Sequence, residues 1–530
     1  MSLGVGSGST GSIGPGHRSS AAPGGLAGPS GGGLRSLVGL RLAEVAALGG
    51  ILALAAIVRS WDLGRLSFWY DEVVTVRLAR AENLEEFGRL LFTIDATRAP
   101  LHPLLLRVWI GSLGASEVAV RSLGVVCGTA TVALTYWVGR LAFDRASGIW
   151  GAWLAVWSPL LVYYSREARM YALLVLLSTL AWALLFRRGG LRSRVAGADG
   201  ETTPGGAAVS LPPWKRSAAD LSYALVLAAL VYTHPLGLLM VATLAGVSLG
   251  FVRVYFGTAR RWLGVHLFAA LLTVPWIPSY FDHPPEFLTG RLPLRFLAGT
   301  PIGFVGGNSL LLVGLTAVVV FGLARRRERL ARSEGLGAAV GLLLWLVLPP
   351  SVLYLFSWVS TPIFGPARYT LYTAPAFLVL LGQGLAELPA AVRYPLSAGL
   401  LAVAAATLGP TVYAPDLKAD WRGFAGDLNR WSQREPNAAV LVLVDSHDPS
   451  RNVEVETARY YLSSRFRVLP AGSAAHSRCF GGEVLLAIGG KDPAAAVSRA
   501  REVGTDRWEL AAVYPGLSVF RRLPLVPPEG

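Results

Sequence analysis

The chain has 530 residues, of which 53% are hydrophobic and only 15% are charged. Soluble domains carry about 25% charged residues, so this composition excludes an ordinary soluble protein and indicates a polytopic helical membrane protein. The net charge of +15 is carried almost wholly by arginine, because lysine occurs only at positions 215, 418 and 491. In a membrane protein such charge is typical of cytoplasmic loops and of contact with anionic lipids, so we expect membrane lipids and no nucleic acid as partners.

The N-terminal segment 1–34 is rich in glycine and serine, and we predict that it is disordered. No apolar core of a cleavable signal peptide lies near Met1. Cys127 lies in an apolar segment and Cys479 in the C-terminal part, so the two cysteines predict neither a disulfide framework nor a metal site.

Residues 35–412 contain about eleven apolar segments of a length that spans a bilayer, which predicts an all-α transmembrane domain. The segments are 37–58, 117–140, 146–164, 168–186, 218–233, 236–252, 262–280, 302–324, 336–357, 368–386 and 392–412. A further apolar segment, 101–113, is too short to cross and contains Arg107. We expect it to form a helix at the membrane interface, within the first outer loop.

Arginine-rich connections follow alternate segments and set the orientation by the positive-inside rule. They contain Arg140 and Arg145; Arg187, Arg188, Arg192, Arg194, Lys215 and Arg216; Arg260 and Arg261; and Arg325, Arg326 and Arg327. We therefore expect a multi-pass protein of the cytoplasmic membrane with its N-terminus in the cytoplasm. The parts outside are then 60–116, 164–168, 233–236, 281–300, 358–367 and everything after 412. This count requires that 101–113 does not cross the membrane.

Residues 413–530 have a different pattern from the rest. The short apolar runs 440–444 and 483–488 are typical of buried strands, and 420–434 and 492–503 have helical patterns. This order predicts a small extracytoplasmic α/β domain after the transmembrane domain.

Titratable side chains gather at the outer ends of the predicted spans. They are Asp71, Glu72, His102, Glu167, Arg169, His234 and Arg368. Ionisable residues at such positions are functional candidates by default, because they do not help a span to insert. We expect them to line a cavity at the outer membrane surface, which would be the active site.

Asp71 is the candidate general base, in the motif Trp69-Tyr70-Asp71-Glu72. A carboxylate there could take a proton from an acceptor hydroxyl as that hydroxyl attacks a sugar carbon. The spacing fits a second interpretation equally well, since aspartate and glutamate are favoured at the N-terminus of a helix.

A dense group of charges and tyrosines, Ser165-Arg166-Glu167-Ala168-Arg169-Met170-Tyr171, lies between two apolar segments. Arg166 or Arg169 could bind a phosphate, for which a guanidinium has the right geometry. Glu167 could tune the base or help to hold a cation. The alternative is a turn with aromatic anchors at the interface.

Three further residues have a functional and a structural interpretation. His102 could bind a phosphate or orient the carboxylate, or it could be a structural residue at a helix start. His234 could belong to the site or simply end a span before Pro235. Arg368 could pair with an anionic headgroup beside a helix end, or it could reach out to lipid.

Taken together and in this order, the motifs resemble those of GT-C-fold glycosyltransferases of family 39. This family includes polyprenyl-phosphate-mannose protein mannosyltransferases and aminoarabinose lipid A transferases. The resemblance covers about 37–412 and rests on Trp69-Tyr70-Asp71-Glu72, Leu101-His102-Pro103-Leu104, Ser165-Arg166-Glu167-Ala168-Arg169-Met170-Tyr171, Thr233-His234 and Ala367-Arg368-Tyr369. It implies a GT-C fold and an inverting transferase in which Asp71 is the catalytic base and Glu72 its partner. It also implies that Arg169, Arg368 and His102 bind the phosphate of the donor. The full set of candidate residues for binding substrate or lipid phosphate is His102, Arg166, Glu167, Arg169, Tyr171, His234, Arg368 and Tyr369.

The expected function is sugar transfer from a polyprenyl-phosphate donor to a hydroxyl of a glycan, lipid or protein at the outer face of the cytoplasmic membrane. A flippase or transporter of lipid-linked sugars is one alternative, although such proteins commonly have an internal repeat and charges through the bilayer depth. Another is a ligase or polymerase that uses a polyprenyl-diphosphate oligosaccharide. No cofactor is certain, but Asp71, Glu72 and Glu167 could hold Mg²⁺ or Mn²⁺, and arginine could replace such an ion.

Overall fold

The computed structural model describes most of the chain, and the site lies in the compact unit Leu48–Gly530. The described residues are 31–198, 213–282, 309–330, 333–360, 367–415, 417–445, 453–473, 482–503 and 507–523, with the single residues 293, 294, 297 and 480. The segment 1–30, where disorder was predicted, and Cys479 lie outside them. Helix α1 begins at Gly31, inside the predicted N-terminal segment.

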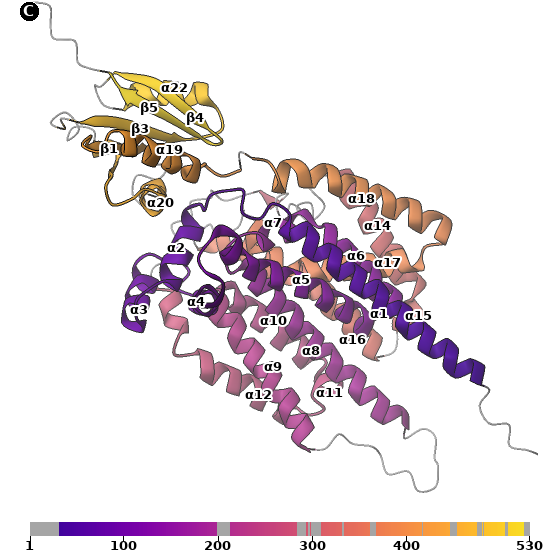
Figure 1. Ribbon diagram of the computed structural model, residues 1–530. Helices are drawn as coiled ribbons and strands as arrows, with labels where there is room; N and C mark the ends of the chain where they lie inside the picture. Colours follow the sequence, from indigo (N-terminus) through magenta and orange to yellow (C-terminus); the bar gives the residue numbers. More distant parts are fainter. Residues whose placement is uncertain are drawn as a thin grey trace, which may run out of the picture. The chain divides into compact units, whose positions relative to one another are not determined.

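The transmembrane domain is helical, as its apolar segments predicted (Figure 1). Its main helices are α1 (Gly31–Ser60), α5 (Glu117–Ala142), α6 (Arg145–Trp157), α7 (Pro159–Ser165), α8 (Tyr171–Ala198), α9 (Pro213–Thr233), α10 (Leu236–Gly250), α12 (Ala259–Thr273), α14 (Ser309–Arg325), α16 (Ser333–Val359), α17 (Ala374–Glu387) and α18 (Ala390–Val412). Shorter pieces are α11 (Val252–Tyr255), η1 (Ile277–Tyr280), α15 (Arg327–Leu330), η3 (Ala367–Tyr369) and η4 (Leu371–Thr373).

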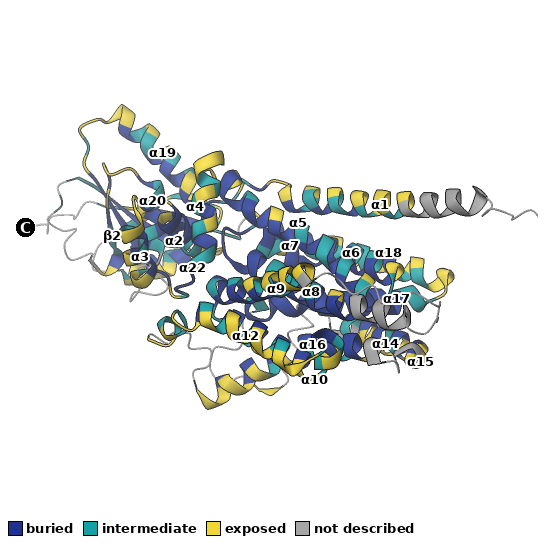
Figure 2. Cartoon of the chain, turned by 90° about the horizontal axis from the view of Figure 1, so that it is seen from below, coloured by how far each residue is buried: buried dark blue, intermediate teal, exposed yellow. Residues whose placement is uncertain are grey.

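The length and apolarity of these helices support several membrane spans. Among the described residues, five helices are long and apolar enough to cross a membrane, or six if the bent pair α6 and α7 is one span. Each of the eleven predicted segments contains a helix, whereas the number of eleven complete spans stays a prediction. Figure 2 shows exposed residues along α18, in whose apolar stretch 17% of the residues are buried, whereas 72% are buried in that of α8. The helix α8 therefore lies inside the bundle, and α18 leaves an apolar face for lipid.

One predicted span is not straight. The apolar run 146–164 forms α6 and α7, which meet at an angle of 63°. Ser158 between them has an extended backbone, and Pro159 begins α7, where its missing N–H costs nothing. The bend brings the end of α7 to the charged segment that follows it.

The first outer loop carries three short helices: α2 (Tyr70–Ala79), α3 (Leu84–Thr93) and α4 (Leu101–Leu113). The predicted helix over 101–113 is therefore confirmed, while its place at the interface stays a prediction. At the start of α2 the backbone N–H of Trp69 donates to Glu72 Oε2 at 3.3 Å. Asp71 and Glu72 thus lie in the first turn, where the helix dipole favours negative charge.

The C-terminal part forms a three-layer α/β structure around one sheet of order β2-β1-β3-β5-β4. The strands are β1 (Val440–Asp445), β2 (Arg467–Pro470), β3 (Glu483–Gly489), β4 (Trp508–Tyr514) and β5 (Leu517–Arg522). The helices are α19 (Trp421–Arg434), α20 (Val453–Tyr461) and α22 (Pro493–Glu502), with the single turn η5 (Ala471–Ser473). Strand β1 is parallel to β2 and β3, and β5 is antiparallel to β3 and β4.

Alternation along β1 divides the core of this domain in two. Val440, Val442 and Val444 pack with α19 and α20, whereas Leu441 and Leu443 pack with α22 on the other face (Figure 1). The predicted strands and helices are confirmed as β1, β3, α19 and α22. Strands β2, β4 and β5 and helix α20 were not predicted.

Candidate functional site

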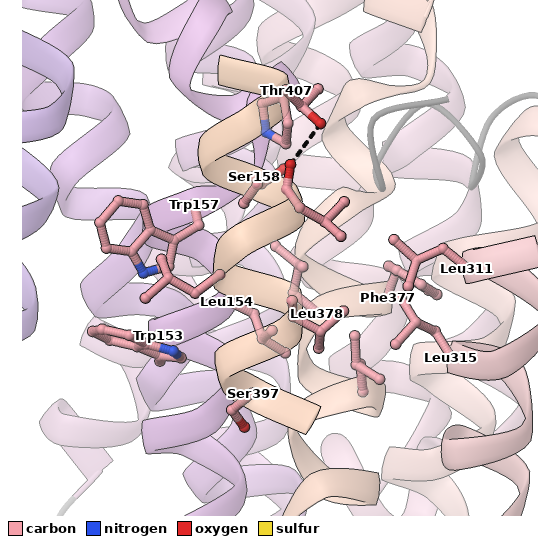
Figure 3. Close-up of a pocket in the computed structure, with 16 residues that line it drawn as sticks. Trp153, Leu154, Trp157, Ser158, Leu311, Leu315, Phe377, Leu378, Ser397 and Thr407 are labelled. Atoms are coloured by element: carbon pink, nitrogen blue, oxygen red, sulfur yellow. Dashed lines mark hydrogen bonds between the residues drawn. The ribbon is translucent and has the colours of Figure 1, made fainter. Parts of the chain in front are cut away.

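A pocket between α6, α14, α17 and α18 is apolar and lies among the transmembrane helices (Figure 3). Its volume is about 60 Å³, and its lining includes Trp153, Trp157, Leu315 and Phe377. No residue of the predicted site lines it. The residues of the predicted site gather instead around α2 and the segment between α7 and α8.

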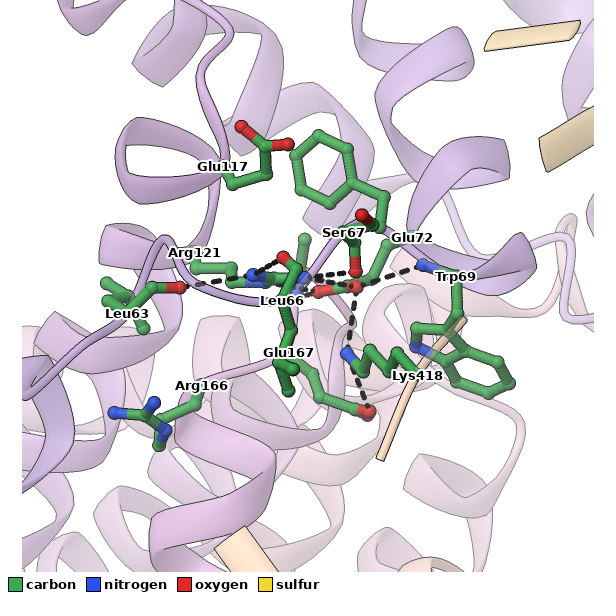
Figure 4. Close-up of polar contacts among 12 residues, drawn as sticks. Leu63, Leu66, Ser67, Trp69, Glu72, Glu117, Arg121, Arg166, Glu167 and Lys418 are labelled. Atoms are coloured by element: carbon green, nitrogen blue, oxygen red, sulfur yellow. Dashed lines mark hydrogen bonds and ion pairs between the residues drawn. The ribbon is translucent and has the colours of Figure 1, made fainter. Parts of the chain in front are cut away.

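Glu72 is the centre of a buried ionic cluster (Figure 4). Its carboxylate accepts from Arg121 Nε at 2.8 Å and Nη2 at 2.9 Å, from Lys418 Nζ at 2.9 Å, and from the backbone N–H of Ala168 at 3.0 Å. The side chain of Glu72 has no exposed surface. Burial alone would raise the pKa of Glu72, but the charges and hydrogen bonds of Lys418 and Arg121 lower it well below its ordinary value. In this arrangement Glu72 stays ionised.

Arg121 of α5 connects this cluster to the chain before α2. Its Nη1 donates to the carbonyls of Leu63 at 3.1 Å and Leu66 at 2.7 Å, and its Nη2 donates to that of Ser67 at 3.0 Å. Its guanidinium also lies 5.1 Å from the centre of the Phe68 ring. These contacts fix the entry into α2 and hence the position of Asp71.

Glu167 lies on the other side of the Lys418 ammonium. Its Oε1 is 3.4 Å from Lys418 Nζ, and the side chain is almost fully buried. Burial raises the pKa of Glu167; Lys418 opposes this rise, and the charges of Glu72 and Asp71 add to it. Figure 4 shows Lys418 between the two carboxylates.

A divalent cation does not fit the residues predicted to hold it. Within the described parts of the chain, no three histidine, cysteine, aspartate or glutamate side chains lie close enough to hold a metal ion. The site predicted from Asp71, Glu72 and Glu167 is therefore not assembled. The positive charge between Glu72 and Glu167 is the Lys418 ammonium.

Of the two carboxylates in the motif, Asp71 is the one that reaches the surface. Its side chain is 24% exposed, and its Oδ2 lies 3.9 Å from Arg169 Nε. Arg169 Nη1 donates to the Asp71 carbonyl at 3.2 Å and to Thr75 Oγ1 at 2.9 Å. Arg169 Nη2 lies 3.9 Å from Asp95 Oδ1, a buried carboxylate. Asp71 and Arg169 thus form a loose pair, with Asp95 behind the arginine.

Close helix packing places Arg169 beside α2. A Cβ on Gly128 of α5 would lie 2.0 Å from Ser165 Oγ, and one on Gly124 would lie 2.7 Å from the Ser165 carbonyl oxygen. Only glycine allows α5 to approach the end of α7 so closely. This approach sets the segment that carries Glu167 and Arg169.

Two histidines are buried near Arg169. Burial, with the charge of Arg169, lowers the pKa of His102 to about 3. Burial, with the charges of Arg169 and Arg368, lowers the pKa of His234 to about 3. Both imidazoles are therefore neutral near pH 7, and they offer hydrogen bonds to a ligand without a positive charge. His234 Nδ1 already accepts from the backbone N–H of Leu236 at 3.0 Å.

Aromatic side chains connect His234 to Arg368. The His234 ring lies 5.8 Å from that of Tyr171 and 6.3 Å from that of Tyr369. The guanidinium of Arg368 lies 5.3 Å from the centre of the Tyr369 ring. Ring contacts through Tyr369, His234 and Tyr171 therefore connect Arg368 to the rest of the site.

Arg169 and Arg368 both have unused hydrogen-bonding capacity. Within the described residues, the Nε atoms of both side chains are buried and have no hydrogen-bond partner. A buried donor without a partner is costly, and an anionic ligand would satisfy it.

Arg166 contacts the end of α1 and Tyr413, away from the other residues of the predicted site. Its guanidinium donates to the carbonyls of Arg59 at 3.0 Å and Asp62 at 3.3 Å, and it lies 4.7 Å from the centre of the Tyr413 ring. In Figure 4 it points away from Lys418. Arg166 therefore connects the end of α1 to the end of α18, and both of its Nη atoms already donate to backbone carbonyls.

Three important residues of the site were not predicted. Asp95 gives no signal, because it is one carboxylate in a polar loop. Arg121 was visible as a charge inside an apolar segment, and Lys418 as one of only three lysines. The importance of Arg121 and Lys418 becomes evident only when Glu72, which both contact, is known to be buried.

The two histidines predict that stability depends on pH. Their folded pKa of about 3 lies below the ordinary value of 6.5, so the unfolded chain binds protons first as the pH falls. The stability they support is therefore complete above pH 6.5 and is lost as the pH falls from 6.5 towards 3. Thermal unfolding in nanodiscs at about pH 7.5 and about pH 5 measures this loss. His102→Gln should show a smaller loss than wild type; an equal loss would contradict the assignment.

Comparison with known proteins supports the fold. No protein-family model matches the chain, and no curated protein matches it. ArnT from Cupriavidus metallidurans bound to undecaprenyl phosphate matches at a TM-score of 0.53 and 14% identity, over 89% of this chain and 97% of that chain. The apo structure of the same ArnT matches at a TM-score of 0.55 and 14% identity, over 92% and 98%. The archaeal oligosaccharyltransferase AglB from Archaeoglobus fulgidus, in complex with an inhibitory peptide and a dolichol-phosphate, matches at a TM-score of 0.49 and 10% identity, over 85% and 69%, which is too low to support an inference.

At 14% identity the likeness to ArnT is one of fold. It extends over nearly the whole of both chains, so it includes the transmembrane and the C-terminal parts. The GT-C fold that the motifs implied is therefore confirmed.

Proposed function

We propose that this GT-C-fold protein is a membrane glycosyltransferase that moves a sugar from a polyprenyl-phosphate donor to an acceptor hydroxyl. The observation that carries the proposal is the pair of Asp71 and Arg169, to which ring contacts through His234 connect Arg368. It combines one carboxylate that reaches the surface with two guanidinium groups whose buried Nε atoms have no hydrogen-bond partner among the described residues. The likeness in fold to an ArnT structure bound to undecaprenyl phosphate supports the choice of a lipid-phosphate donor.

The reaction needs one base and a site for a departing phosphate. The acceptor hydroxyl gives its proton to Asp71 while its oxygen forms a bond to the anomeric carbon. The bond between that carbon and the phosphate oxygen breaks on the opposite face, which inverts the anomeric centre. The electron pair leaves with the polyprenyl phosphate, whose negative charge increases by one. This leaving group needs no proton, so an acid is not required.

Arg169 and Arg368 are suited to stabilise the charge that develops on the phosphate. Both are held in place by aromatic or acidic neighbours before the donor binds, so little reorganisation is needed. The neutral imidazoles of His102 and His234 would orient the phosphate or the sugar by hydrogen bonds. Tyr171 and Tyr369 would line the same site through their contacts with His234.

We propose that Asp71 alone is the base. Glu72 is the adjacent carboxylate, but Arg121 and Lys418 occupy it and no part of it is exposed. The acceptor would be a hydroxyl of a glycan, lipid or protein at the outer face of the cytoplasmic membrane. A flippase is less consistent with this site, because its charges lie on short helices and connections and not along the middle of spans.

A transfer assay with an arginine variant tests the proposal. Purified protein in nanodiscs is incubated with radiolabelled polyprenyl-phosphate sugar and a membrane extract, and label in product is measured. Arg169→Gln should lower the rate by about 10²- to 10³-fold, because it removes a preorganised cation from the phosphate site. Arg187→Gln, an exposed arginine of α8 with the same charge change, is the control and should leave the rate unchanged. Transfer that is equal in both variants, or absent from wild type with each sugar supplied, would reject the proposed function.

A further inference from the structure

Lys418 is an ammonium group buried between two carboxylates of different elements. Its Nζ lies 2.9 Å from Glu72 Oε2 and 3.4 Å from Glu167 Oε1. Only 7% of the Lys418 side chain is exposed, with 0% of Glu72 and 3% of Glu167. A lysine is rarely buried to this extent unless it is paired, so its two partners explain its position.

We propose that Lys418 is a built-in cation of the active site, and that it takes the place a divalent ion would have between Glu72 and Glu167. This inference rests on the proposed function and adds that transfer is independent of metal ions. Hard divalent cations require several oxygen ligands. Of the two carboxylates, Glu72 already binds Arg121 through both oxygens and Lys418 through Oε2. Both oxygens of Glu72 are therefore occupied, and the Lys418 ammonium lies where a cation shared with Glu167 would be.

Lys418 acts as a positioning residue and does not touch the reacting atoms. Glu72 directly follows Asp71 in α2, and Glu167 lies two positions before Arg169. One ammonium thus joins the backbone that carries the base to the backbone that carries a phosphate-binding arginine. A charge that holds two such segments affects the distance between Asp71 and Arg169, which is 3.9 Å.

The chain around Lys418 is itself fixed to the first outer loop. Asp420 Oδ1 accepts from Ser67 Oγ at 3.0 Å and from the backbone N–H of Gly423 at 3.0 Å, which caps α19. Arg422 donates to the carbonyls of Gly64 at 2.9 Å and Arg65 at 2.7 Å. The start of the C-terminal domain therefore holds Lys418 in the site.

Removing Lys418 should open a place for a metal ion. Lys418→Ala leaves the Glu167 carboxylate without its cation and removes one of the donors to Glu72 Oε2, which still accepts from Arg121. Without added metal, we expect transfer by this variant to fall by about 10- to 100-fold, as is usual when a residue that supports a site is lost. Added Mn²⁺ should restore part of that loss, while wild type should transfer equally with EDTA and with Mn²⁺.

The experiment uses the full chain in nanodiscs and has a readout besides activity. The thermal midpoint is measured with EDTA and with Mn²⁺ for wild type, Lys418→Ala, and the control Lys215→Ala, whose side chain is exposed. We expect Mn²⁺ to raise the midpoint of Lys418→Ala only, because a ligand stabilises the folded state that binds it. Lys418→Met, which keeps the apolar stem, replaces the alanine variant if that one does not fold.

Several outcomes would overturn the inference. It is wrong if EDTA inhibits wild type and Mn²⁺ restores transfer, or if Mn²⁺ raises the midpoint of wild type as much as that of the variant. It is also wrong if Lys418→Ala transfers as fast as wild type in EDTA. If wild type shows no transfer at all, the proposed function fails, and the thermal midpoints still decide whether Lys418 takes the place of a cation.

Discussion

Asp71→Asn should lower the rate of sugar transfer by about 10²- to 10⁴-fold, the usual contribution of a general base. The substitution keeps the shape of the side chain and removes its ability to take a proton. The side chain is 24% exposed and lies 3.9 Å from Arg169, so no tightly buried contact is lost. We therefore expect the thermal midpoint and the binding of donor to remain near those of wild type. Initial rates at saturating donor measure the effect.

A carboxylate of the same loop provides the control for Asp71. Glu85 lies in the first turn of α3 and is exposed. Glu85→Gln makes the same change from acid to amide outside the site and should leave transfer unchanged. A rate for Asp71→Asn that equals that of Glu85→Gln would remove Asp71 as the base, whatever the role of the arginines.

Arg121→Gln should have the largest effect on stability, a loss of about 3–5 kcal/mol. It takes two hydrogen bonds from the buried Glu72 carboxylate and three from the carbonyls of Leu63, Leu66 and Ser67. Glu72 would remain ionised because Lys418 still pairs with it. Its charge would then lie in a place with no access to water. Thermal and denaturant unfolding of the protein in nanodiscs measure the loss.

An exposed ion pair gives the matched comparison for Arg121. Arg77 of α2 lies 2.5 Å from Glu456 of α20, and 42% of the Arg77 side chain is exposed. Exposed pairs contribute little, so Arg77→Gln should cost less than about 1 kcal/mol. Similar losses in the two variants would mean that burial of the Glu72 cluster adds nothing to stability.

Hydropathy predicted the helices because a bilayer demands long apolar segments. It does not report where such a segment bends: the run 146–164 is apolar throughout, and only Ser158-Pro159 marks the angle between α6 and α7. The order of the strands in the sheet of the C-terminal domain could not be predicted from the sequence either. Strands β1 and β3 are continuous apolar runs, whereas β4 is largely exposed and its sequence does not stand out.

The sequence predicted which residues gather at the site. It did not predict which partners each of them contacts. Asp71, Arg169, His234 and Arg368 do come together, because their motifs mark the ends of neighbouring helices. Neighbouring residues of a helix, however, direct their side chains to different sides of that helix. Asp71 faces Arg169 at the surface, while Glu72, one position later, faces inward to Arg121 and Lys418. Similarly, Arg166 and Arg169 are three positions apart and contact different partners.

The Glu72 cluster also orders events during synthesis of the chain. Arg121 follows Glu72 by 49 residues, so this pair can form while the bundle is still being made. Lys418 follows Glu72 by 346 residues, which at about 5–20 residues per second is a delay of roughly 20–70 s. Insertion of the helices and completion of the site are thus separate steps. The ionic cluster around Glu72 is therefore complete only after the chain has been made as far as Lys418, at the start of the C-terminal domain.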